Sequence, residues 1–139
     1  TTGIQGLDLL GRKILGSGGK ILAPFIEEIR SFCTNNIGSA YVAETETSLN
    51  QLLNLTEVIG AAADENPDEV NAAGVDYLMF AGYTTMAYCW AKIAKIAKTA
   101  QAAINNSSSD AGFYHAKLHT ARFYFERILP RTQTLATTM

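Results

Sequence analysis

The feature that most constrains this chain is a stretch from residue 66 to residue 104 that has the pattern of one long helix. No proline follows its start before Pro130, and it opens with Asn66, Pro67, Asp68 and Glu69. An Asn cap, a proline at the first helical position and acidic residues in the first turn all favour a helix start there. At about 1.5 Å per residue, an unbroken helix would extend roughly 50 Å, so the other segments have to pack around it.

The two halves of this predicted helix differ in polarity. Residues 77–91 include no charged side chain, and their apolar groups point in every direction, which is typical of a helix buried on most sides. From Lys92 onward the pattern becomes one-sided, with lysines on one face. The opposite face is predicted to carry Cys89, Ile93, Ile96, Ala97, Ala100 and Ile104. We expect the first half to be surrounded and the second half to lie across the edge of a bundle.

A shorter helix is predicted at the start of the chain. Thr2 and Gln5 have the spacing of a capping box, and apolar residues then recur at helical spacing as far as Ile14. The glycine-rich segment 16–19 ends this helix and forms a flexible joint. We predict a domain boundary there, with residues 1–16 as one unit and residues 17–139 as the other.

Three further helices are predicted from apolar residues that recur every three or four positions. They cover about residues 20–35, 39–63 and 111–129, and the polar segment 105–110 offers Ser109 or Asp110 as the cap of the last one. Pro130 is expected to end that helix, and the tail 131–139 to form one helical turn and then fray. The sequence therefore predicts an all-α fold, an up-and-down four-helix bundle preceded by a short helix.

The composition agrees with one soluble domain that has a real hydrophobic core. The 139 residues are 47% hydrophobic and 17% charged, with a net charge of −2 and a pI of about 5.6. This balance gives no support to nucleic-acid binding. The uncharged run 77–91 is shorter than the ~20 residues that a membrane-spanning helix needs, so we expect no transmembrane segment.

The two cysteines, Cys33 and Cys89, lack CxxC spacing and fall on apolar faces of predicted helices. We expect both to be small buried hydrophobic residues. Unpaired cysteines of this kind fit a reducing compartment, and we predict a cytoplasmic location.

His115 and His119 are the strongest candidates for a metal site, because residues four apart share one face of a helix. The zinc-protease pattern needs a Glu directly after the first His, and Ala116 occupies that position. Since no third ligand is nearby in the sequence, we predict no metal site and two partly exposed histidines. No nucleophile, base and orienting group can be assembled with any specificity either, so we predict no catalytic residue within this chain.

The opening of the chain resembles the end of the catalytic domain of acyl-CoA dehydrogenases. Its sequence TTGIQGLDLLGRK is similar to a family segment of the form YEGT-x-x-IQ-x-LDLLGRK, which follows the active-site loop. In that family the Glu of the segment is the base that removes the α-proton of the acyl thioester. The resemblance implies that this Glu lies before Thr1 and that residues 1–16 are the last helix of a catalytic domain.

The remainder of the chain carries a second resemblance. Residues 74–78 and 113–130 are similar to a C-terminal helical extension found in a subgroup of bacterial acyl-CoA dehydrogenases, with a run FY-x-AK-x-x-TARF-x-x-x-x-LP near its end. Together, the resemblances imply a parent enzyme that oxidises acyl-CoA to 2,3-enoyl-CoA with FAD. The implied partners are the rest of the parent chain, a homo-oligomer mate, the acyl-CoA substrate and an electron-transfer acceptor.

The first resemblance also implies a cofactor contact. Thr1, Thr2 and Gly3 match the flavin-contacting turn of the family, and Gln5 matches the Gln of its IQ pair as a weaker candidate. Gly3 departs from the family, which often has a larger polar residue there, so only a backbone contact is expected at that position. The start of a helix presents free N–H groups to an anionic cofactor. We expect residues 1–139 alone to hold no flavin and to be inactive, because most of the flavin site lies outside them.

Two hypotheses about function follow. In the first, the chain is the C-terminal domain of a flavin-dependent acyl-CoA dehydrogenase and serves structure or oligomerisation. In the second, it is a non-enzymatic helical module that oligomerises or binds a membrane surface or a partner. The apolar half of the long helix and its lysine face motivate the second hypothesis. The two are compatible if the module serves the enzyme.

Overall fold

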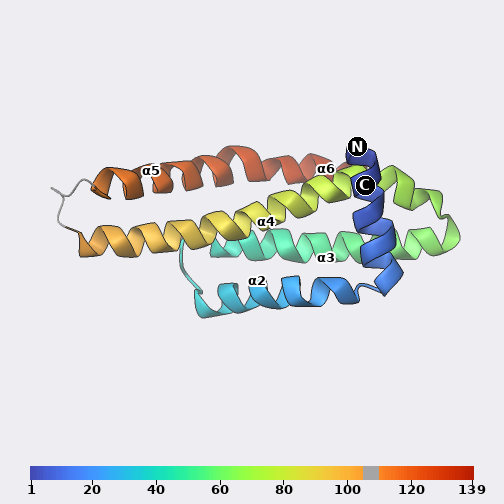
Figure 1. The fold of residues 1–139 in the computed structure, drawn as a ribbon, viewed down its shortest axis with the longest axis horizontal. Helices are drawn as coiled ribbons and strands as arrows, with labels where there is room; N and C mark the ends of the chain where they lie inside the picture. The colour runs from blue at the N-terminus through green and yellow to red at the C-terminus, as the bar shows by residue number, and fades with distance from the viewer. Residues whose placement is uncertain (105–109) are drawn as a thin grey trace.

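The computed structural model describes residues 1–104 and 110–139, and every regular element in those ranges is helical. The longer helices are α2 (Ala23–Asn35), α3 (Val42–Glu65), α4 (Asp68–Ala103) and α5 (Asp110–Phe123), and they lie along the long axis of the molecule (Figure 1). The predicted all-α fold, a four-helix bundle after a short leading helix, is confirmed. The polar loop predicted around residues 105–109, with Ser109 as a candidate cap, lies outside the described residues.

The leading helix crosses the bundle instead of running along it (Figure 1). α1 (Thr2–Leu7) continues into a π-helical segment, Asp8–Ile14, and 3-10 turns at Leu15–Ser17 and Lys20–Leu22 connect it to α2. Between the two turns, Gly18 and Gly19 have φ angles of 61° and 77°, a left-handed conformation that glycine adopts without steric penalty. The glycine-rich segment therefore ends the leading helix, as the sequence predicts, and redirects the chain into α2 along the bundle (Figure 1).

The capping box predicted at Thr2 is wrong. The chain is already helical at Thr2, so Thr1 holds the cap position, and its side chain makes no capping hydrogen bond. The first turn is joined instead by the backbone, with the Gln5 N–H donating to the Thr1 carbonyl at 3.0 Å. The backbone N–H groups that precede Gln5 in this turn have no partner within the helix.

The start of α4 is fixed by Asn66, as the sequence predicts. The Asn66 Oδ1 atom accepts the backbone N–H of Asp68 at 3.2 Å, and its Nδ2 atom donates to Glu69 Oε1 at 3.1 Å. This reciprocal arrangement satisfies a donor that the first helical turn would otherwise leave unpaired. From there α4 runs without interruption to Ala103.

α4 packs against most of the other segments, and α2 packs mainly on α3. One core cluster joins α4 to the leading helix and α3, with Leu10, Ile14, Leu52, Ile59, Ala73, Tyr77 and Phe80 buried. A second joins α4 to the helical segment after α5, with Ala87, Ala91, Tyr124, Phe125 and Leu129 buried. A third lies between α2 and α3 and contains Ile29, Cys33, Val42 and Leu49. The prediction that the long helix organises the fold is borne out by these packing partners.

The prediction that residues 77–91 are surrounded is wrong on one side of α4. Met79 and Met86 are 42% and 47% exposed, and Cys89, predicted to be buried, is exposed as well. From Lys92 onward the buried residues are Ala94 and Ala97, so of the predicted face only Ala97 is buried, whereas Ile96 is 61% exposed. These small side chains let α5 approach closely, which turns the larger apolar side chains outward. Cys33 is buried, as predicted.

The prediction that the tail frays is also wrong. After a π-helical segment, Tyr124–Ile128, and a 3-10 turn, Leu129–Arg131, the chain forms α6 (Thr132–Thr138). Proline is tolerated at the start of a helix, where its missing N–H would have no partner in any case. Leu135 and Ala136 pack against the first core cluster, and Thr138 Oγ1 donates to Asp76 Oδ2 at 2.5 Å. Packing on α4 therefore holds the tail helical.

Candidate functional site

The residues predicted to contact a flavin lie together on the first turn of α1. Thr1, Thr2, Gly3 and Gln5 are all exposed. A Cβ atom added at Gly3 would meet nothing within 4 Å, so the backbone there is open to approach from outside. The turn has the free N–H donors and hydroxyl groups that suit an anionic group such as a diphosphate. Its donor set therefore suits the predicted cofactor.

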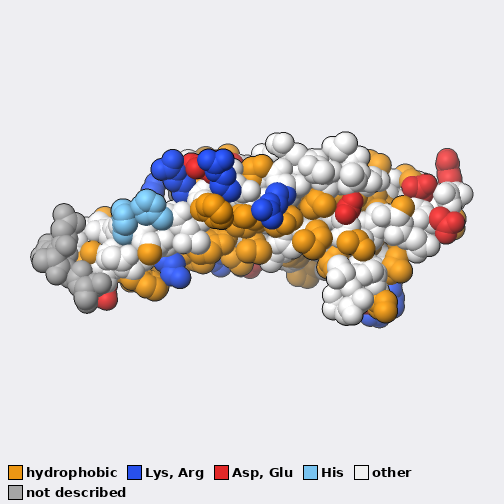
Figure 2. Space-filling model, turned by 90° about the horizontal axis from the view of Figure 1, so that it is seen from above, with side chains coloured by type: hydrophobic (Ala, Val, Ile, Leu, Met, Phe, Trp, Pro, Cys, Tyr) orange, Lys and Arg blue, Asp and Glu red, His pale blue; other side chains and the backbone are white. Residues whose placement is uncertain are grey.

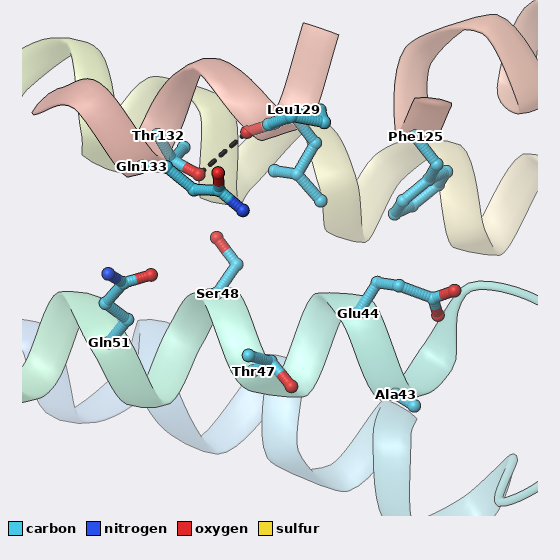
Figure 3. Close-up of a pocket in the computed structure, with 10 residues that line it drawn as sticks. Ala43, Glu44, Thr47, Ser48, Gln51, Phe125, Leu129, Thr132 and Gln133 are labelled. Atoms are coloured by element: carbon cyan, nitrogen blue, oxygen red, sulfur yellow. Dashed lines mark hydrogen bonds between the residues drawn. The ribbon is translucent and has the colours of Figure 1, made fainter. Parts of the chain in front are cut away.

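A polar groove of about 330 Å³ lies between α3 and the segment that leads into α6 (Figure 3). Its polar side chains include Glu44, Thr47, Gln51 and Gln133. Ser48 also faces this groove, and its hydroxyl shares a hydrogen bond of 2.8 Å with the buried hydroxyl of Thr84. Because Ser48 has no adjacent His or Lys among the lining residues, the groove has no activated nucleophile.

An apolar pocket of about 330 Å³ lies where the leading segment meets α2 and α4. It is lined mostly by aliphatic and aromatic side chains, and Lys13 is its one charged lining residue. The lining residues are Leu9, Lys13, Ile14, Ile21, Leu22, Phe25, Leu52, Tyr77, Leu78, Ala81, Gly82 and Thr85. A pocket of this composition suits an apolar side chain or an acyl group.

A cationic cleft of about 280 Å³ lies between α5, the end of α4 and the turn before α3. Lys98, His115, His119 and Arg122 line it, and no carboxylate is among its lining residues. Figure 2 shows both histidines beside basic side chains on this part of the surface. The charge of this cleft suits a small anion.

The floor of the cationic cleft is Tyr41, which has an unusual backbone conformation. Its φ of 68° is left-handed, a conformation that costs a residue with a Cβ atom about 1–2 kcal/mol. The Tyr41 ring stacks on that of Phe125, with the centroids 4.3 Å apart and the planes at 2°. This stacking contact offsets the backbone cost and holds the turn against the π-helical segment that follows α5.

The predicted pair of exposed histidines is confirmed. His115 and His119 are both exposed, and their Nε2 atoms lie 2.9 Å apart. Within residues 1–104 and 110–139, no group of three or more His, Cys, Asp or Glu side chains is placed to hold a metal ion. In the same ranges, no helix is both long and apolar enough to cross a membrane.

The feature that sequence reasoning missed is an exposed apolar stripe along α4, here called the outer stripe. It consists of Val75, Met79, Gly82, Met86, Cys89, Ile93 and Ile96. Six of its members are exposed and Ile93 is half-buried. The residues follow one another at steps of four and three, which is the spacing of a coiled-coil seam. That spacing was the available signal, but the absence of charge throughout 77–91 obscured it.

The two free thiols differ sharply in their surroundings. Cys33 is only 2% exposed, and burial raises the pKa of its thiol, so it stays protonated and unreactive near neutral pH. Cys89 lies in the middle of the outer stripe and is exposed. A reagent for thiols therefore has access to the stripe and not to the core.

These features define a helical domain: a bundle organised on one long helix, with an exposed apolar stripe along that helix. The chain belongs to the family described as acetyl-CoA dehydrogenase C-terminal like, whose model matches residues 25–139. The predicted resemblance to the C-terminal extension of acyl-CoA dehydrogenases is confirmed by this match.

A relative in the bacterium Ruegeria pomeroyi also has the name of an acyl-CoA dehydrogenase. The chain is 30% identical over 136 residues to a protein named 3-methylmercaptopropionyl-CoA dehydrogenase. The alignment covers 93% of this chain and 22% of that protein, so the chain spans about a fifth of the length of the relative. No solved structure matches the chain.

Proposed function

We propose that this chain is the C-terminal domain of a flavin-dependent dehydrogenase that oxidises acyl-CoA to 2,3-enoyl-CoA. The observation that carries the proposal is the relative named as a CoA-thioester dehydrogenase, which aligns with nearly the whole chain. The family match over residues 25–139 supports it. FAD, when bound to the longer polypeptide, would supply the two-electron acceptor for this reaction.

In this proposal the described residues support the reaction and do not perform it. The catalytic Glu of the resembled segment lies before Thr1, and residues 1–16 form the last helix of the catalytic part. Thr1, Thr2 and Gly3 would contact the flavin through the open first turn of α1, with Gln5 as a weaker contact. Residues 17–139 then form an accessory domain, in a cytoplasmic enzyme that assembles with a second subunit and passes electrons to a separate acceptor.

The direct test uses the longer polypeptide and the 139-residue chain in parallel. We expect the longer protein to carry flavin absorbance and to bleach when an acyl-CoA is added without an electron acceptor. The 139-residue chain should be colourless. A longer protein without flavin, or one whose flavin is not reduced by any of a series of acyl-CoA chain lengths, would contradict the proposal.

A second candidate function is a helical interaction module, and the outer stripe is the observation that favours it. A contiguous exposed apolar surface of this kind marks a site of contact with another macromolecule. Sedimentation of the 139-residue chain, alone and with lipid vesicles, distinguishes self-association from membrane binding. A monomer that stays in solution with vesicles would contradict both versions.

A further inference from the structure

The outer stripe has the geometry of a surface that packs against another helix. Its seven positions from Val75 to Ile96 extend about 32 Å along α4, at ~1.5 Å per residue. The alternating steps of four and three keep all seven on one side of the helix. None of the seven carries a charge.

The outer stripe begins where the leading helix crosses α4. A Cβ atom added at Gly6 would lie 3.0 Å from the backbone nitrogen of Val75, so α1 passes directly beside the first residue of the stripe. Two apolar residues of α1 are also exposed to solvent: Ile4 is 75% exposed and Leu7 is 39% exposed. The exposed apolar surface thus continues from the stripe onto the helix that leads toward residue 1.

A preformed apolar pocket lies next to the stripe. The apolar pocket of about 330 Å³ shares Gly82 with the stripe and is also lined by Leu78, its neighbour on α4. Interfaces gain most of their affinity where a large side chain of the partner fills such a pocket. At the opposite end, Ile93 and Ile96 line a smaller apolar cleft with Phe113 of α5, where Lys117 supplies a charged rim.

We propose that the outer stripe is covered by a helix of the dehydrogenase part of the same polypeptide, the part that precedes Thr1. This inference rests on the proposed function. The aligned relative is several times longer than the chain, since the alignment covers only 22% of it, so a protein of that kind has ample length to supply the partner. Because α1 crosses α4 beside Val75, a polypeptide that continued before Thr1 would start close to this end of the stripe and would need no long linker to reach it.

The exposed thiol of Cys89 reports on this contact. In the 139-residue chain we expect a maleimide to label Cys89 quickly and to leave Cys33 unlabelled, because Cys33 is buried. In the longer polypeptide Cys89 should be labelled at least about tenfold more slowly, and equally slowly at every protein concentration, as expected for a site that is covered within one polypeptide and reacts only during local opening. Cys33 serves as an internal control in both proteins.

A matched pair of substitutions separates the stripe from the rest of the surface. Met86→Lys places a charge in the stripe, one turn from Cys89, and should restore fast labelling of Cys89 in the longer polypeptide. Val58→Lys changes a residue of α3 that is 57% exposed and lies off the stripe, and it should leave the labelling slow. Both variants should label quickly in the 139-residue chain.

The outcomes distinguish this inference from the proposed function. A longer polypeptide that reduces its flavin with acyl-CoA but labels as fast as the 139-residue chain would overturn the inference and leave the proposed function intact. Protection of Cys89 in the 139-residue chain that rises with concentration, together with a dimer in solution, would show that a second copy covers the stripe and would also overturn it. A longer polypeptide without flavin or turnover would overturn both.

Discussion

The backbones of Gly6 in α1 and Gly74 in α4 lie in direct contact where the two helices cross. A Cβ atom at Gly6 would stand 2.5 Å from the carbonyl oxygen of Gly74 and 2.6 Å from its carbonyl carbon. No side chain fits in that space, so only glycine at position 6 lets the leading helix cross α4 this closely. The contact sets the direction in which the chain before Gly6 leaves the bundle.

Gly6→Ala should therefore separate the two helices and destabilise the chain by about 1–3 kcal/mol, the usual cost of overpacking. Urea unfolding followed by circular dichroism measures this loss. Gly3→Ala is the matched control, because it lies in the same helix and its Cβ atom meets nothing within 4 Å. The control should be neutral or stabilising by up to ~1 kcal/mol, since alanine favours helix. Equal effects of both substitutions would show that the crossing is not as close as described.

A second prediction concerns the buried hydroxyl pair of Ser48 and Thr84. The two oxygen atoms lie 2.8 Å apart, and Thr84 is fully buried. Thr84→Val keeps the shape and removes the partner of Ser48, so we expect a loss of about 1–3 kcal/mol. Ser48→Ala combined with Thr84→Val should cost less than the sum of the two single changes. Additive losses in this double-mutant cycle would mean that the hydroxyls do not interact.

The third prediction is a loss of stability in alkaline solution. Burial raises the pKa of Tyr124 and of Tyr77 above their ordinary value of 10.0. Above pH 10 these phenols lose their protons in the unfolded chain and keep them in the folded one. The unfolded state then binds fewer protons, so stability is complete below pH 10 and falls as the pH rises further.

Tyr124→Phe tests that origin. The Tyr124 hydroxyl donates to the Tyr83 carbonyl at 2.6 Å, so its removal should cost about 1 kcal/mol at neutral pH. The same variant should make the decline above pH 10 shallower, because one of the two buried phenols no longer titrates. Urea midpoints measured across the alkaline range give both quantities. A decline as steep as that of the unsubstituted chain would assign the effect to other groups.

Sequence reasoning located the helices well because their ends are marked by local chemistry. The side chains of Asn66 and Glu69 share a hydrogen bond at the start of α4, and the glycines at positions 18 and 19 end the leading helix and redirect the chain. Both signals act between residues close in sequence. The predicted domain boundary at residues 16–17 stays a prediction, since the helix before it shares the core of the bundle through Leu10 and Ile14.

The predictions from sequence were wrong where contacts between segments far apart in the chain determine which residues are buried or helical. The pattern of α4 does not indicate which side of residues 77–91 stays exposed, because apolar residues occupy every side of that stretch. The exposed side depends on how closely the neighbouring helices pack on α4, and this close packing places small residues at the contact. The helical tail likewise depends on contacts between α6 and α4, which no local signal after Pro130 indicates.

The candidate site shows the same division. The open turn at Thr1, Thr2 and Gly3 follows from the local sequence pattern, and its contact with a flavin stays a prediction. The grooves could not be predicted, because each joins residues from separate helices. Glu44 of α3 and Gln133 of α6, for example, line one groove although they are far apart in the sequence.

The fourth prediction follows from the correction of the tail. Leu135 of α6 packs against the first core cluster and is half-buried, so Leu135→Ala should cost about 1–2 kcal/mol, less than the ~2–5 kcal/mol for a fully buried leucine. Thr134→Ala, at an exposed neighbouring position, is the control and should change stability little. If the tail frays as the sequence alone suggests, neither substitution will have a measurable effect on the urea midpoint.

The last prediction separates packing within the domain from packing on a partner. Met79 and Met86 are 42% and 47% exposed, so lysine at both positions should leave the unfolding free energy of the 139-residue chain within about 0.5 kcal/mol of its original value. Phe80→Ala, at a fully buried neighbouring position, should instead cost about 3–5 kcal/mol. Because the outer stripe faces solvent in this chain, its apolar character adds little to the folding of residues 1–139, which agrees with the proposed contact with a partner helix. A loss of several kcal/mol in the double lysine variant would show that the stripe is already packed within the domain, and the argument for an external partner would fail.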